Sequence, residues 1–281
     1  MNPIMTPIMN LRKRLTLSLL AACLGLFPSP VTAQSALSRL SDRNDLLGWE
    51  AVGRLELGGK GFCTGTLIAA DLVLTAAHCV FDRQSGKLLD PGRLTFRAGL
   101  RDGVSIAERT GLQIAVPPDY APQNALSWDN VRRDVALLRL SEPISTTDAD
   151  PFALYTGSNP GRDVSVASYG QGRTEAISRQ RQCRLLRTAR DLMAFDCNVT
   201  FGSSGAPVFA RAGSRGQILS VISGMARVDG RKLAMGMALP EMVATLKAQM
   251  RRAPVSAPLK PIRRLRVGSG ARTSGAKFVR P

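Results

Sequence analysis

The sequence predicts an all-β protein with two β-units and a C-terminal helix. From residue 49 to residue 238, short apolar runs alternate with turn-forming residues, a spacing typical of antiparallel strands. Residues 141–160 show no periodicity and contain three prolines, so they are expected to cross from the first unit to the second. Residues 240–252 carry apolar side chains near helical spacing.

The first β-unit is expected within residues 49–145. Partial alternation of apolar and polar residues predicts a strand at 49–57, and the glycine-rich residues 58–61 after it predict a turn. Further strands are predicted at 62–68, 72–76, 94–98, 105–107, 113–116 and 135–140.

The second β-unit, within residues 146–252, repeats the same rhythm. Its predicted strands are 164–169, 183–188, 193–197, 207–209, 217–223 and 232–238. The helix at 240–252 is predicted because Pro240 suits a first helical turn and because Met242, Val243, Leu246 and Met250 fall near one face.

The N-terminal residues 1–33 have the pattern of a signal peptide. Basic Arg12-Lys13-Arg14 precede an apolar stretch at 15–27, and cleavage is expected after Ala33. The sequence therefore predicts a secreted or periplasmic bacterial protein, whose polar residues 34–48 form a loose mature N-terminal segment. Leu20-Ala21-Ala22-Cys23 also resembles a lipobox, so a lipoprotein anchored through Cys23 is the alternative.

The formal net charge of +17 is unevenly spread. Nine basic residues and no acid lie in 251–281, whereas residues 34–250 hold 26 basic and 21 acidic residues. The basic tail at 253–281 is expected to be disordered, with acidic polymers or an anionic membrane surface as candidate partners. No specific nucleic-acid partner is expected, because the body is only modestly basic. We interpret the arginines between Arg179 and Arg190 as a solvated strand face, with an acidic-surface site as the alternative.

Four cysteines remain once the leader is removed. An even number in an exported chain predicts disulfides, and four cysteines permit three pairings. Closeness in sequence favours Cys63 with Cys79 and Cys183 with Cys197.

His78 is the only histidine in the chain and follows an apolar run, Leu72 to Leu74. Imidazole titrates near pH ~6.5, so it is well suited to take and return a proton at neutral pH. Asp134 stands before the apolar residues 135–138, and a carboxylate held there could orient the imidazole. Asp129 is the alternative acid, although no apolar strand follows it.

Ser204 is the candidate nucleophile, in the small-residue run Gly202-Ser203-Ser204-Gly205-Ala206-Pro207. A serine hydroxyl needs a base to take its proton. Gly202 would let main-chain N–H groups converge on a developing oxyanion, so Gly202 and Ser204 are predicted to form the oxyanion hole.

The three segments around His78, Asp134 and Ser204 resemble the chymotrypsin-like, trypsin-fold serine endopeptidases. The family's hallmarks are a Thr-Ala-Ala-His-Cys box, an Asp-Ile/Val-Ala-Leu-Leu box and a Gly-x-Ser-Gly-x-Pro box, and the likeness covers residues 49–250. The resemblance implies two antiparallel six-stranded β-barrels with a catalytic cleft between them, a Ser-His-Asp triad, a protein or peptide substrate and a bridge from Cys63 to Cys79.

Two departures from the family pattern concern activation and specificity. Ser203 replaces the acid that trypsin-type members carry before the nucleophile, and no Ile-Val-Gly-Gly start lies near Trp49. Activity is therefore expected without a new Ile-led terminus. Asp196-Cys197 is similar to the bacterial glutamyl-endopeptidase branch, but that branch has a pocket histidine and none follows His78, so strict Glu specificity is not expected.

The predicted substrate pocket has no acid at its expected base. The position six residues before Ser204 is Asn198, so trypsin-like cleavage after Lys or Arg is not implied. Asn198, Ser223 and Gly224 are predicted to form the pocket wall. We expect a monomer without metal or cofactor. The alternative function is a catalytically silent homologue that binds partners through its cleft or basic tail.

Overall fold

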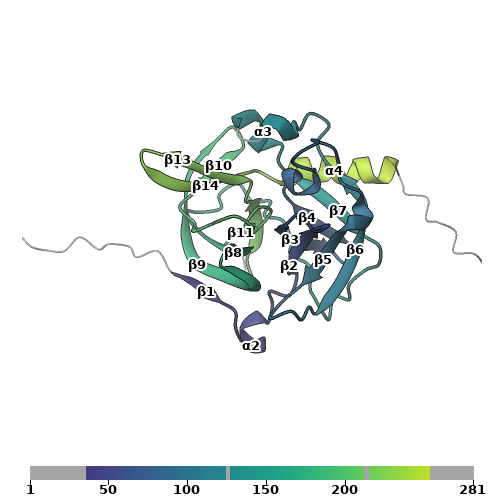
Figure 1. Ribbon diagram of the computed structural model, residues 1–281. Helices are drawn as coiled ribbons and strands as arrows, with labels where there is room; N and C mark the ends of the chain where they lie inside the picture. The colour runs from purple at the N-terminus through teal and green to yellow at the C-terminus, as the bar shows by residue number, and fades with distance from the viewer. Residues whose placement is uncertain (1–35, 125–126, 212–214, 254–281) are drawn as a thin grey trace, which may run out of the picture.

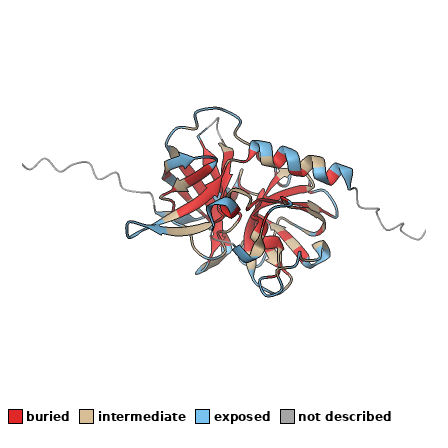
Figure 2. Ribbon diagram, turned by 90° about the horizontal axis from the view of Figure 1, so that it is seen from above, coloured by how far each residue is buried: buried red, intermediate tan, exposed pale blue. Residues whose placement is uncertain are grey.

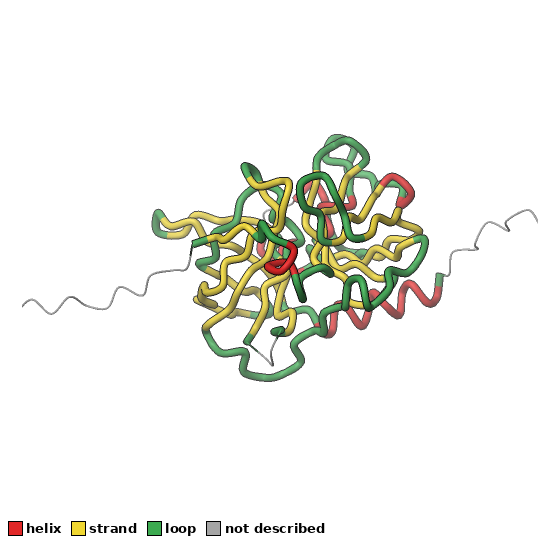
Figure 3. The backbone as a smooth tube through the Cα atoms, turned by 90° about the horizontal axis from the view of Figure 1, so that it is seen from below, coloured by secondary structure: helices red, strands yellow, loops and turns green. Residues whose placement is uncertain are grey.

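Two β-units stand side by side in the computed structural model, which describes residues 36–124, 127–211 and 215–253 (Figure 1). Helices are few, as the tube view shows (Figure 3). Buried residues fill the inside of both units, and exposed residues gather on loops and hairpin tips (Figure 2). The predicted all-β class is confirmed.

The first unit is a closed barrel of six antiparallel strands. Its strands are β2 (Val52–Leu57), β3 (Phe62–Ala69), β4 (Leu72–Thr75), β5 (Leu94–Ala98), β6 (Ala107–Ala115) and β7 (Ala136–Leu140), in the closed order β2-β3-β4-β7-β6-β5. Phe96 fills the interior so closely that a Cβ on Gly53 would lie 2.4 Å from its ring. The two short strands predicted at 105–107 and 113–116 are one strand, β6, because the residues between them also pair with β5 and β7.

The second unit is a half-barrel sheet rather than the closed six-stranded barrel that the resemblance implied. It runs in the order β12-β11-β8-β9-β10-β14-β13, with β1 (Leu37–Arg39) paired to β9. The bounds are β8 (Asp163–Gly170), β9 (Arg173–Ala189), β10 (Leu192–Phe195), β11 (Pro207–Ala210), β12 (Gln217–Val221), β13 (Gly224–Val228) and β14 (Arg231–Met237).

Isolated bonds replace a ladder where this second sheet would close. The Met237 N–H donates to Ser220 Oγ at 2.9 Å, and the Ser223 N–H donates to the Met235 carbonyl at 2.9 Å. A ladder needs both backbones in register along several residues, whereas here one of the two acceptors is a side chain. β12 and β14 therefore approach each other but do not pair as neighbouring strands of a sheet.

Within the segment expected to be loose, residues 34–48, the described residues 36–48 include a strand and a short helix. β1 pairs with β9 at Leu37–Gln180 through Arg39–Ser178, and α2 (Arg43–Leu46) follows. Leu40 and Leu46 are buried. Burial of these apolar side chains offsets the entropy of ordering the segment, which the polar composition alone did not indicate.

The C-terminal helix α4 (Pro240–Arg252) has the predicted bounds and begins with proline. Val243, Leu246 and Met250 are its buried residues, and the helix lies against β6 and β7 of the first barrel (Figure 1). The shorter α3 (Trp128–Arg132) was not predicted. Ser127 caps it by accepting a hydrogen bond from the Asn130 N–H.

Both disulfides join the cysteines that closeness in sequence favoured, Cys63 with Cys79 and Cys183 with Cys197. No helix in the described ranges is long and apolar enough to span a membrane. The expected signal peptide at 1–33, the Cys23 lipobox and the basic tail from residue 254 lie outside the described residues.

Candidate active site

His78 sits on a single 3-10 turn, η2 (Ala77–Val80), directly after the buried strand β4. The Thr75 hydroxyl donates to the Thr64 carbonyl at 2.9 Å, which ties the end of β4 to β3. The Cys63–Cys79 bridge joins the turn itself to β3. The imidazole is therefore presented from a rigid base, with 19% of its side chain exposed.

Asp134 lies between α3 and β7, with 3% of its side chain exposed. Its Oδ1 accepts the His78 backbone N–H at 2.8 Å, and its Oδ2 lies 2.8 Å from His78 Nδ1. This geometry orients the ring and leaves Nε2 as the nitrogen free to act as a base. The alternative acid, Asp129, is 76% exposed and pairs instead with Arg132.

Two further side chains shape the surroundings of Asp134. The Ser223 hydroxyl donates to Asp134 Oδ2, although 89 residues separate them. Burial, together with the nearby negative charge of Asp134, raises the pKa of Tyr120, so its hydroxyl stays protonated. Ser223 was predicted only as a pocket wall, and no local pattern could reveal a contact between two units.

The loop around Ser204 has a backbone that glycine makes possible. Gly202 has φ +91° and Gly205 has φ +76°, values that L-residues rarely adopt. A Cβ on Gly202 would also lie 2.3 Å from the Phe62 ring. Ser204 is left partly exposed at the turn before β11.

Thr64 on β3 holds the carbonyl groups of this loop. Its N–H donates to the Ser204 carbonyl and its hydroxyl to the Gly202 carbonyl, both at 2.9 Å. Among the described residues, no acceptor binds the N–H groups of Gly202 or Ser204. Two open donors beside a serine hydroxyl are what stabilisation of an oxyanion requires. Thr64 was not predicted as a site residue, because its role depends on how the two units meet.

A cleft of about 680 Å³ brings these groups together. Residues of both units line it, including His78, Asp134, Ser204, Ser223 and Gly224. Asn198 is not among the cleft residues and instead lines a neighbouring hollow of about 350 Å³ together with Asp196 and Lys232. The two hollows share three lining residues, Val199, Thr200 and Met225.

The cleft wall contributed by the second unit is largely apolar. Val199, Ile222, Met225, Ala226 and Met235 contribute to it, and Trp128 and Phe201, 56% and 69% exposed, also line the cleft. The two acids that line the cleft are both engaged, Asp134 with His78 and Asp82 with Lys60. Lys60 holds the pKa of Asp82 well below its usual range.

Cys63, His78 and Cys79 place their ligand-type atoms within 4.8 Å of one another. The two sulfurs are joined in a disulfide, so neither is available as the thiolate that binds metals. The imidazole alone could offer a ligand atom here.

Comparison with known proteins gives three related findings. A family model, the trypsin-like peptidase domain, matches residues 63–215. The chain is 28% identical over 156 residues to a glutamyl endopeptidase of Bacillus licheniformis, covering 55% of this chain and 47% of that protein. It is 30% identical over 199 residues to serine protease Hayan of Drosophila melanogaster, covering 68% and 29%. The chain thus spans less than half the length of these curated relatives.

A solved structure of a Glu endopeptidase in complex with MPD resembles the fold. Its TM-score is 0.64, the match covers 79% of this chain and 99% of that chain, and the sequences are 16% identical. At this identity the likeness concerns the fold.

Proposed function

The chain belongs to the trypsin-like peptidase family, and we propose that it is a serine endopeptidase that cleaves peptide bonds through an acyl-enzyme on Ser204. The observation that carries the proposal is the His78–Asp134 pair, which shares one cleft with Ser204 and with two unoccupied N–H donors. This combination of a base, an orienting carboxylate, a nucleophile and oxyanion donors is suited to acyl transfer.

In this mechanism His78 Nε2 takes the proton of the Ser204 hydroxyl while Oγ attacks the scissile carbonyl carbon. The carbonyl oxygen becomes an oxyanion, which the N–H groups of Gly202 and Ser204 stabilise. Protonated His78, stabilised by Asp134, then gives its proton to the leaving amine as the C–N bond breaks. Water repeats the sequence to release the acid and restore Ser204.

The test is covalent labelling by a fluorophosphonate, which reacts with an activated serine and needs no knowledge of the substrate. A single adduct on Ser204 of the wild-type protein is the expected result. Absence of any adduct would contradict the proposed hydrolase and leave a binding role for the cleft.

The apolar wall of the cleft supports cleavage after an apolar residue. A lysine or arginine side chain buried there would lack a partner, since both acids lining the cleft are engaged, and burying an unpaired charge is costly. We therefore propose apolar residues, rather than Lys or Arg, as the residue whose carbonyl is attacked.

Matched peptides that differ only at that residue test this preference. We expect kcat/KM for leucine or methionine to exceed that for arginine or lysine by on the order of a hundredfold. A preference for glutamate, the residue suggested by the name of the Bacillus licheniformis relative, would overturn the assignment, as would a preference for arginine.

We also propose that the protein is exported. The two disulfides support this, because disulfides persist in oxidising compartments. Expression of the full chain in a bacterial host should give a product whose intact mass corresponds to a chain that starts at Gln34. A mass that corresponds to acylated Cys23 would establish the lipoprotein alternative, and an uncleaved Met1 would contradict export.

A further inference from the structure

Arg173 is the first residue of β9 and contacts the loop that carries Ser204. Its Nη1 donates to the Ser168 carbonyl at 2.7 Å, and its Nη2 donates to Ser203 Oγ at 3.0 Å. No carboxylate pairs with Arg173 among the described residues. A half-buried cation without a counterion is costly, so its presence here calls for a reason.

The guanidinium remains charged at neutral pH. Burial lowers the pKa of Arg173 to about 10, which still leaves the group protonated in any ordinary medium. The strand before it makes room for the group, because a Cβ on Gly170 would lie 2.9 Å from Arg173 Cζ. A side chain at position 170 would therefore displace the guanidinium from this place.

Ser203, the partner of Arg173, is fully buried and has its hydroxyl in a defined set of bonds. Ser203 Oγ accepts from Arg173 and from the Thr200 N–H at 3.3 Å, and its proton has two acceptors on β8, the Tyr169 carbonyl at 3.1 Å and Ser168 Oγ at 3.3 Å. Because Arg173 can only donate, it directs the single Ser203 proton toward β8. The side chain between the two oxyanion donors is thereby fastened to the sheet.

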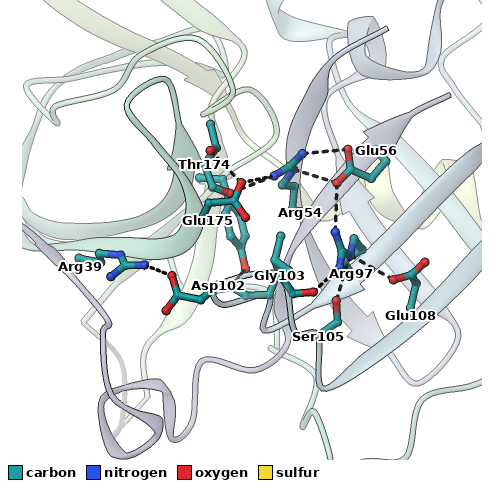
Figure 4. A network of polar contacts seen from close by, with 12 residues as sticks. Arg39, Arg54, Glu56, Arg97, Asp102, Gly103, Ser105, Glu108, Thr174 and Glu175 are labelled. Carbon is teal, nitrogen blue, oxygen red and sulfur yellow. Dashed lines mark hydrogen bonds and ion pairs between the residues drawn. The ribbon is translucent and has the colours of Figure 1, made fainter. Parts of the chain in front are cut away.

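The residues that follow Arg173 are anchored to the first barrel. Arg54 of β2 donates to the Thr174 carbonyl at 3.2 Å and pairs with Glu175 at 3.1 Å (Figure 4). The Asp102 N–H donates to the Glu175 carbonyl at 2.7 Å. Both units thus determine where the β8–β9 hairpin tip places the guanidinium.

We propose that Arg173 is the positioning residue of the oxyanion loop: its guanidinium fixes Ser203, and through Ser203 it keeps the N–H groups of Gly202 and Ser204 aimed at the cleft. The cation comes from within the chain, so the loop is assembled as soon as the two units fold. This inference rests on the proposed peptidase function, but its test can fail separately.

Arg173→Met removes the donors and the charge with little change in volume. We expect kcat and the rate of fluorophosphonate labelling to fall on the order of 10²-fold, with KM changed less than about threefold, because the loss of one oxyanion donor has an effect of this size on kcat. Arg181→Met is the matched control, since Arg181 is exposed on the same strand and its loss should leave both rates unchanged.

Chemical rescue and hydrogen exchange distinguish the proposed positioning role of Arg173 from a role limited to folding. Methylguanidine added to Arg173→Ala should restore labelling at least tenfold, whereas it should not affect the Ser204→Ala protein. Amide exchange in residues 199–206 should be faster in Arg173→Met than in Arg181→Met, a readout that needs no catalysis. If Arg173→Met does not fold, the labelling rate of Arg173→Lys and the rescue of Arg173→Ala by methylguanidine take its place as the test.

Wild-type rates and unchanged amide exchange in Arg173→Met would overturn the inference. An unlabelled wild-type protein would overturn the proposed function instead, and the exchange comparison would then still decide whether Arg173 orders the loop.

Discussion

Replacing Ser204 by alanine is expected to reduce peptide hydrolysis on the order of 10⁶-fold, because the acyl-enzyme can no longer form. Fluorophosphonate labelling should disappear, since the reagent bonds to the same oxygen. Ser204 is partly exposed and its side chain has no hydrogen bond to the described residues that the fold would lose, so the free energy of unfolding should change by less than about 0.5 kcal/mol. Rates on the best peptide from the substrate series, mass spectrometry of the label and thermal unfolding provide the measurement.

The adjacent serine is the comparison for this variant. Ser203 is fully buried and bonded to β8, so Ser203→Ala should slow labelling through disorder of the loop but retain the adduct on Ser204. An adduct that persists in Ser204→Ala and is lost in Ser203→Ala would show that Ser203, not Ser204, is the nucleophile. That result would contradict the mechanism.

Replacing Asp134 by asparagine is expected to lower kcat about 10⁴-fold while the fold is kept. In the wild type the Asp134 carboxylate accepts a hydrogen bond from His78 Nδ1 at 2.8 Å. In the variant the asparagine NH₂ group can take this position and donate to Nδ1 instead. The ring would then carry its proton on Nε2, where it cannot accept the proton of Ser204. Because His78 is the only histidine, nitrogen NMR of the imidazole reports this tautomer without overlap.

Asp129→Asn is the matched control for this substitution. Asp129 is exposed on α3 and pairs with Arg132, and an exposed ion pair contributes little. We expect its kcat and imidazole spectrum to equal those of the wild type. An Asp134→Asn protein with wild-type kcat, or an Asp129→Asn protein with the larger loss, would refute the assignment of Asp134 as the orienting acid.

The local pattern of residues was sufficient for most of the strands and for the C-terminal helix. Alternation of apolar and polar side chains follows from the geometry of a strand, so β5, whose residues alternate in burial, could be predicted with little reference to the rest of the chain. Pro240 and the apolar residues after it specified α4 in the same local way. The long β9 was seen only in part, because the residues of its first half do not alternate in polarity.

The sequence by itself determined which chemical groups the candidate site contains: one imidazole, an acid before an apolar strand, and a serine between glycines. Only the tertiary structure decided that Ser223 bonds to Asp134, that Thr64 holds the Ser204 loop and that Arg173 fastens Ser203. These contacts join residues separated by 30 to 138 positions. Their formation depends on strand register, bulges and the docking of the two units, which no local pattern of residues encodes.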